Sequence, residues 1–79
     1  MRAKINRGKA GRSIDRLVKE YGFKYPYQYW MYILDTFIGG NKDQSIKLFN
    51  QMRGENQKSM LLNLDSEGSS FKDFIIQNL

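Results

Sequence analysis

The chain has 79 residues and a net charge of +5, and it contains neither cysteine nor histidine. That composition excludes disulfides and the usual zinc sites, so we expect no metal and no cofactor. No apolar run approaches the roughly 20 residues of a membrane span. We therefore expect one soluble, cytoplasmic domain with no membrane partner.

The excess positive charge lies in the first quarter of the chain. Residues 1–20 hold seven bases against two acids, whereas residues 21–79 hold six bases and six acids. The seven bases are Arg2, Lys4, Arg7, Lys9, Arg12, Arg16 and Lys19. A charge block of this kind is typical of arms that bind nucleic acid, although solubilising tails look similar.

Residues 1–12, "MRAKINRGKAGR", are expected to form a flexible basic arm ahead of a single helical domain of residues 13–79. Past the start, their one sizeable apolar side chain is Ile5, which is too little to offset the entropy of ordering the segment. The stretch "NRGKAGR" resembles the Arg-Gly-Arg core of AT-hooks but lacks the prolines beside it. A minor-groove arm like that of homeodomains needs only arginine and reach.

The first predicted helix spans residues 13–21. Ser13 is a good N-cap, and Gly22 suits the left-handed residue that closes a helix. Apolar residues follow the cap at the spacing of an amphipathic helix, namely Ile14, Leu17, Val18 and Tyr21. The opposite side would carry Arg12, Arg16 and Lys19.

The second predicted helix begins at Pro26 and runs to Ile38, just before two glycines. Proline is favoured in the first turn, where its missing N–H would be unpaired in any case. On a wheel of about 100° per residue, one broad face holds the expected core. That face carries Tyr27, Trp30, Met31, Ile33, Leu34, Phe37 and Ile38.

Tyr29 and Tyr32 fall on the opposite, polar face of this helix, and Tyr25 lies just before it. Another part of the chain can cover these rings, since the central helix of a small bundle is often buried nearly all round. The alternative is an exposed aromatic patch that stacks on bases or anchors a protein partner.

The first two helices partly resemble a helix-turn-helix over "SIDRLVKEYGFKYPYQYWMYIL". The turn would fall at Gly22, and the second helix would present Gln28, Tyr29 and Tyr32 outward. The turn is shorter than that motif uses, and Pro26 followed by bulky tyrosines is unusual for a recognition helix.

Two further helices are expected after the glycine pair. Asn41 or Asp43 would cap the third helix, and Gly54 would close it. A weaker fourth helix is expected around residues 57–64, followed by a turn at residues 65–69.

A last helix would be capped by Ser70, with Asp73 at its third position as a variant of the capping box. Its apolar stripe is Phe71, Phe74, Ile75 and Leu79. No stretch alternates with period two for long enough to form a strand. The predicted fold class is therefore all-α, a compact bundle of four or five short helices.

The acids are scattered and no nucleophile has a recognisable base nearby, so we do not expect an enzyme. The sequence predicts a small basic nucleic-acid-binding protein, DNA favoured over RNA, with a regulatory or accessory role such as phages or plasmids encode. The seven bases would contact phosphates, and Tyr25, Tyr29 and Tyr32 would extend that surface. The alternative is a protein-binding module or inhibitor that docks on an acidic partner surface. Either would be a monomer or a homodimer.

Overall fold

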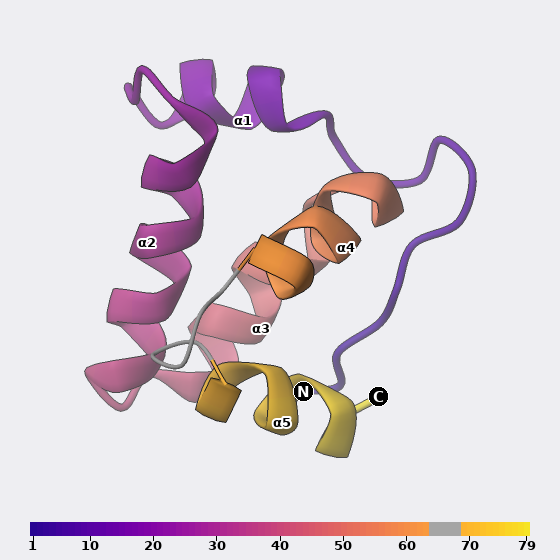
Figure 1. The fold of residues 1–79 in the computed structure, drawn as a ribbon, viewed down its shortest axis with the longest axis vertical. Coiled ribbons are helices and arrows are strands. Elements are labelled where there is room, and N and C mark those ends of the chain that lie inside the picture. The colour runs from indigo at the N-terminus through magenta and orange to yellow at the C-terminus, as the bar shows by residue number, and fades with distance from the viewer. Residues whose placement is uncertain (64–68) are drawn as a thin grey trace.

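The computed structural model describes residues 1–63 and 69–79, and this part of the chain folds into five helices. They are α1 (Ile14–Glu20), α2 (Pro26–Ile38), α3 (Lys42–Asn50), α4 (Gly54–Asn63) and α5 (Ser69–Gln77). Helix α1 lies across one end of α2, α3 packs beside α2, and α5 lies at the other end (Figure 1). The predicted all-α class is confirmed.

The limits predicted for the first two helices are confirmed. The Ser13 hydroxyl accepts a hydrogen bond from the Arg16 backbone N–H, and Gly22 adopts the left-handed φ of 75° after α1. Helix α2 begins at Pro26 and ends at Ile38. Local chemistry of caps and turns fixed both boundaries.

The prediction that Gly54 closes the third helix is wrong, because α3 ends at Asn50 and Gly54 begins α4. Between the two helices the backbone pairs with Arg12 instead of continuing as helix. Arg12 N–H donates to the Gln51 carbonyl, and Arg53 N–H donates to the Arg12 carbonyl, at 2.7 and 3.0 Å. This non-local bridge takes the chain out of the helix earlier than its glycine suggests.

Asn41 is the residue that caps α3, since its side-chain oxygen accepts from the Gln44 backbone N–H at 3.3 Å. The N-cap predicted for the last helix is wrong, because α5 begins at Ser69 and Ser70 therefore lies inside its first turn. The predicted turn at residues 65–69 falls mostly outside the described residues.

The core takes side chains from all five helices and from the N-terminal residues. Its fully or almost fully buried members are Ala3, Leu17, Tyr29, Ile33, Leu34, Ile46, Leu48, Phe49, Met52, Met60, Phe71 and Ile75. Such a continuous apolar interior is a main source of stability for so short a chain, which has no cysteine to form a disulfide.

The face of α2 that the wheel assigned to the core is partly wrong. Tyr27, Met31 and Ile38 are exposed, whereas Tyr29 is fully buried and Trp30 is half-buried. Apolar residues surround α2 on nearly every side, so periodicity alone does not determine its orientation. The positions of α1 and α3, its main neighbours, decide which side is covered.

Residues 1–12, called the N-terminal segment below, run along one edge of the molecule from α5 to α1 (Figure 1). Ala3 is buried, and its backbone N–H donates to the Asn78 carbonyl at 2.8 Å. The chain ends therefore lie close together.

Amide side chains hold this segment against α3 and α4. Gln57, fully buried, accepts from the Asn6 backbone N–H at 2.8 Å and donates to the Lys4 carbonyl at 2.9 Å. The Asn6 amide in turn donates to the carbonyls of Asn50 and Met52. The segment thus packs on the helical domain through polar contacts that its composition does not reveal. Its mobility in solution stays a prediction, which backbone relaxation measurements test.

We expect alanine at Gly11 to destabilise the protein more than alanine at Gly8. Both glycines have positive φ, 87° and 59°, so each substitution carries backbone strain of about 1–2 kcal/mol. Only at Gly11 would the new Cβ also collide with backbone, 2.5 Å from the Met52 carbonyl oxygen, which adds roughly 1–3 kcal/mol. Urea unfolding of the two variants measures the difference, and equal losses would contradict the packing of the segment on Met52.

Candidate nucleic-acid interface

All seven bases of residues 1–20 are exposed. They are carried by the N-terminal segment and by α1, and this part of the chain passes from one end of the molecule to the other (Figure 1). The longest dimension of the molecule is 26 Å. The cations are therefore spread along one side of the molecule and across one end, rather than gathered at one point.

Three of the seven already have partners inside the molecule. Arg12 and Arg16 both form ion pairs with Glu20, at 2.7 and 3.0 Å, and Arg2 donates to the Leu79 carbonyl at 2.9 Å. Among the described residues, the side chains of the other four form neither an ion pair nor a hydrogen bond: Lys4, Arg7, Lys9 and Lys19. Those four are the cations most available to a phosphate.

Tyr29 does not belong to any such surface, which corrects its assignment as a binding residue. Its side chain is fully buried, and its hydroxyl donates to the Leu48 carbonyl at 2.7 Å. Burial raises the pKa of the Tyr29 phenol above its ordinary value. A ring held in this way cannot stack on a base.

Tyr25 and Tyr32 both reach the surface, but they contact different rings. Tyr25 is 55% exposed and stacks on Tyr27, with ring centroids 5.8 Å apart and planes 10° apart. Tyr32, 38% exposed, instead packs against the rings of Tyr21 and Phe23. The predicted patch of three tyrosines is therefore replaced by an exposed pair, Tyr25 and Tyr27. Tyr27 was missed because the wheel assigned it to the core.

The partial likeness to a helix-turn-helix does not extend to its base-reading face. The Gln28 side chain accepts from the backbone N–H groups of Lys24 and Tyr25, at 2.7 and 2.9 Å, and so caps the start of α2. Tyr29 beside it is buried. Two of the three side chains expected to point outward are thus engaged within the protein.

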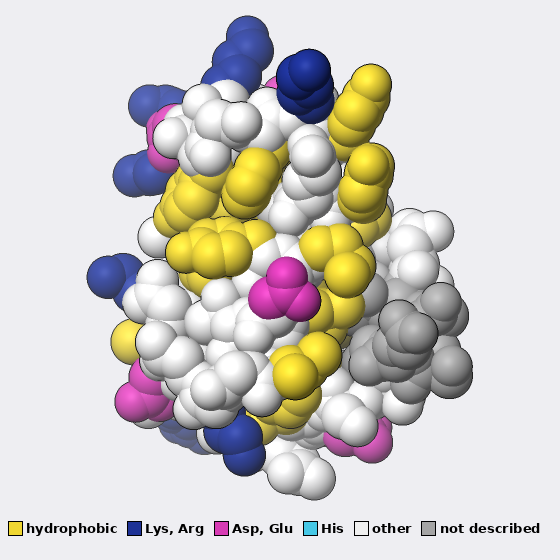
Figure 2. Space-filling view, turned by 90° about the vertical axis from the view of Figure 1, so that its left-hand side faces the viewer, with side chains coloured by type: hydrophobic (Ala, Val, Ile, Leu, Met, Phe, Trp, Pro, Cys, Tyr) yellow, Lys and Arg dark blue, Asp and Glu magenta, His cyan; other side chains and the backbone are white. Residues whose placement is uncertain are grey.

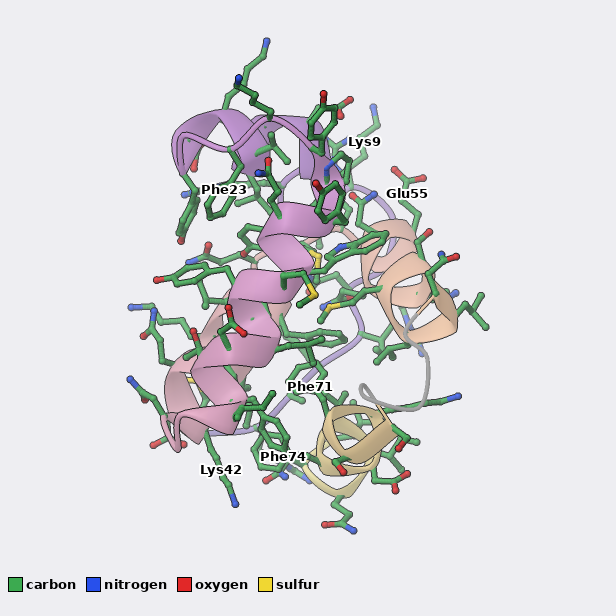
Figure 3. All side chains as sticks on the ribbon, turned by 60° about the vertical axis from the view of Figure 1, so that its left-hand side comes forward. Lys9, Phe23, Lys42, Glu55, Phe71 and Phe74 are labelled. Carbon is green, nitrogen blue, oxygen red and sulfur yellow. The ribbon has the colours of Figure 1, made fainter. Side chains whose placement is uncertain are left out.

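Two further cations, Arg53 and Lys58, join those of the N-terminal segment. Residues 5–9 and 53–55, with Lys58, line a recess of about 780 Å³, called the α4 recess below. Figure 3 labels Lys9 and Glu55, which lie on its two walls, one on the segment and one at the start of α4. Sequence reasoning missed Arg53 and Lys58 because only the folding of the segment onto α4 brings them near Arg7 and Lys9.

Across residues 1–63 and 69–79, no three potential metal ligands cluster. Nor is any helix in these ranges long and apolar enough to cross a membrane. Comparison with protein-family models, with curated proteins and with solved structures finds no match for this chain. The case for a function therefore depends on its own residues.

Proposed function

We propose that the protein binds nucleic acid, with duplex DNA favoured over RNA, by contacting backbone phosphates with the exposed cations of residues 1–20. The observation that carries this proposal is that all seven bases are exposed on a stretch of chain that passes along the molecule. The side chains of four of them form neither an ion pair nor a hydrogen bond among the described residues. Acids in this stretch number only two, and one of them is shared by two arginines.

The size of the molecule suits contact with a duplex. Each strand of B-form DNA places one phosphate about every 3.4 Å along the helix axis, so a molecule with a longest dimension of 26 Å lies beside roughly seven phosphate levels of a strand. A line of cations held by a folded chain matches regularly spaced phosphates better than those of an irregular single strand. Contacts of this kind position a protein on DNA without reading its sequence, which fits a small regulatory or accessory protein of the kind that phages and plasmids encode.

Mobility-shift titrations with duplex DNA, single-stranded DNA and duplex RNA over a salt series test the proposal. We expect the tightest binding with duplex DNA. The slope of log K against log salt should be about −3 to −4, because four free cations each release nearly one counterion. No binding to any of the three at low salt would overturn the proposal.

A protein partner is the second candidate, and the exposed apolar side chains of α2 favour it. Figure 2 shows hydrophobic side chains gathered on this face of the molecule, with cations above and beside them. The exposed members on or next to α2 are Tyr25, Tyr27, Met31, Tyr32 and Ile38. Exposed aromatic and methionine side chains of this kind are typical of protein interfaces. The cations nearby would then suit an acidic rim on that partner.

A further inference from the structure

The α4 recess lies where the N-terminal segment crosses the start of α4. Its walls come from parts of the chain about 45 residues apart, residues 5–9 on one side and residues 53–55 with Lys58 on the other. The two walls approach closely because Gly54 has no side chain: a Cβ there would collide with the Asn6 carbonyl.

The recess is strongly basic. It is lined by four cationic residues, Arg7, Lys9, Arg53 and Lys58, against one acid, Glu55. Within the described residues none of the four side chains forms an ion pair or a hydrogen bond. The Arg53 Nε–H is in addition buried, without an acceptor among the described residues. An anion in the recess would be attracted by the four cationic side chains and could form charge-assisted hydrogen bonds with them.

Hydrogen bonds hold both walls of the recess in the absence of a ligand. The Arg53 N–H donates to the Arg12 carbonyl, and its own carbonyl accepts from the N–H groups of Asn56 and Gln57, all at 3.0 Å. On the other wall, Asn6 is held by the buried side chain of Gln57. Binding then costs little ordering of the backbone, which is the condition for a preformed site.

The start of α4 adds to the positive potential. Gly54 and Glu55 are the first two residues of this ten-residue helix, and both line the recess. The backbone N–H groups of a first turn have no partner within their helix, and the helix dipole places partial positive charge there. The helix start therefore adds to the attraction that the four cationic side chains exert on an anion, and it would not form a binding site by itself.

We propose that the α4 recess binds a phosphate monoester, carried by a free nucleotide or by the end of a nucleic-acid strand. Its volume of about 780 Å³ lies within the roughly 300–1,000 Å³ of small-ligand pockets. A terminal phosphate can approach the recess from its free side, whereas a backbone phosphodiester is bonded to a neighbouring nucleotide on both sides. A monoester also carries about 1.5 to 2 negative charges, against the single charge of a diester. The strand-end form of this proposal rests on the proposed function; the free-nucleotide form does not.

The test compares probes that differ only in the terminal phosphate. Thymidine 5′-monophosphate and thymidine form one pair, and a short oligothymidylate with a 5′-phosphate or a 5′-hydroxyl forms the other. Calorimetry gives the affinities, and NMR spectra report shifts of the backbone amides of Gly8, Lys9, Gly54 and Glu55. We expect the phosphorylated probe of at least one pair to bind about tenfold tighter, with shifts centred on these amides. Equal binding within both pairs, or shifts centred elsewhere, would overturn the proposal.

Matched variants separate the recess from overall charge. Lys9→Gln with Lys58→Gln should reduce affinity for the phosphorylated probe at least tenfold, because charge-assisted hydrogen bonds to the phosphate are lost. Lys47→Gln with Lys72→Gln removes the same charge from exposed positions elsewhere and should have little effect. Glu55→Gln should strengthen binding, because it removes the one acid that lines the recess. Equal losses in the two double variants would count against the recess.

The two proposals fail separately. In one outcome, duplex DNA with unphosphorylated ends binds, but no phosphorylated probe binds more tightly than its unphosphorylated partner. The proposed function would then remain, and the proposal of a phosphate site in the recess would fail. In the other outcome, thymidine 5′-monophosphate binds tightly and no nucleic-acid polymer binds. The phosphate site would then remain, and the proposed function would fail.

Discussion

Replacing Tyr29 by alanine should unfold most of the protein at room temperature, whereas replacing Tyr27 by alanine should leave its stability nearly unchanged. The two tyrosines are two residues apart in α2, yet Tyr29 is fully buried and Tyr27 is 57% exposed. Emptying a buried aromatic site costs about 3–5 kcal/mol, which approaches the total stability of so small a domain.

Melting followed by circular dichroism, with urea unfolding at fixed temperature, measures these effects. Tyr29→Phe keeps the ring and should cost only about 1 kcal/mol, because it removes one hydrogen bond to the Leu48 carbonyl. That carbonyl also accepts from the Gln51 N–H at 3.3 Å and is not left unpaired. Trp30→Ala should fall between the tyrosine variants, since Trp30 is half-buried. A folded Tyr29→Ala protein with unchanged melting would mean that α2 faces another way.

The elements that sequence predicted well are those decided within a few residues. Ser13 caps α1 through its own hydroxyl, Gly22 supplies the left-handed turn, and Pro26 opens α2. Each signal acts between near neighbours in the chain, so it can be read without knowing the fold.

The features that could not be predicted from the sequence depend on contacts between distant residues. Gly54 has the same conformational freedom at the end of a helix as at its start, and contacts with the distant Arg12 and Asn6 accompany its place at the start of α4. The buried amide of Gln57 looks like any exposed glutamine in the sequence, yet it holds the N-terminal segment in place. A count of apolar residues therefore underestimates what can order this segment.

The candidate interface also combines features that are visible in the sequence with features that depend on the fold. The charge block was visible in composition, and the exposure of its bases agrees with it. The predicted exposure of two tyrosines was reversed, because the orientation of α2 about its axis buries Tyr29 and exposes Tyr27. Arg53 and Lys58 lie far from the N-terminal charge block in the sequence, and only the fold brings them close to Arg7 and Lys9.

The packing of the N-terminal segment changes how its role in binding has to be tested. Deleting residues 1–11 would remove Ala3 from the core and the hydrogen bonds that Asn6 forms with α3 and α4. Lost affinity in such a protein would not distinguish binding from folding. Substitution of the unpaired cations leaves the backbone contacts in place.

We expect glutamine at the four unpaired cations to weaken duplex DNA binding strongly and to flatten its salt dependence. The set is Lys4, Arg7, Lys9 and Lys19, all exposed. Each phosphate contact contributes about 0.9 to the slope of log K against log salt, so four lost contacts flatten it by roughly 3–4 units. Melting temperatures should stay close to that of the parent protein, because no side-chain hydrogen bond is removed.

The matched control places glutamine at four exposed lysines outside residues 1–20, namely Lys24, Lys42, Lys47 and Lys72. Both variants lose four positive charges, so a binding mode that depends on net charge alone would weaken equally in the two. Phosphate contact along the segment and α1 predicts instead that the control keeps most of the slope. The duplex used has unphosphorylated ends, so it carries no terminal phosphate that could bind in the α4 recess. Equal flattening in the two variants would show that these cations hold no particular place on the DNA, and the proposed interface would have to be abandoned.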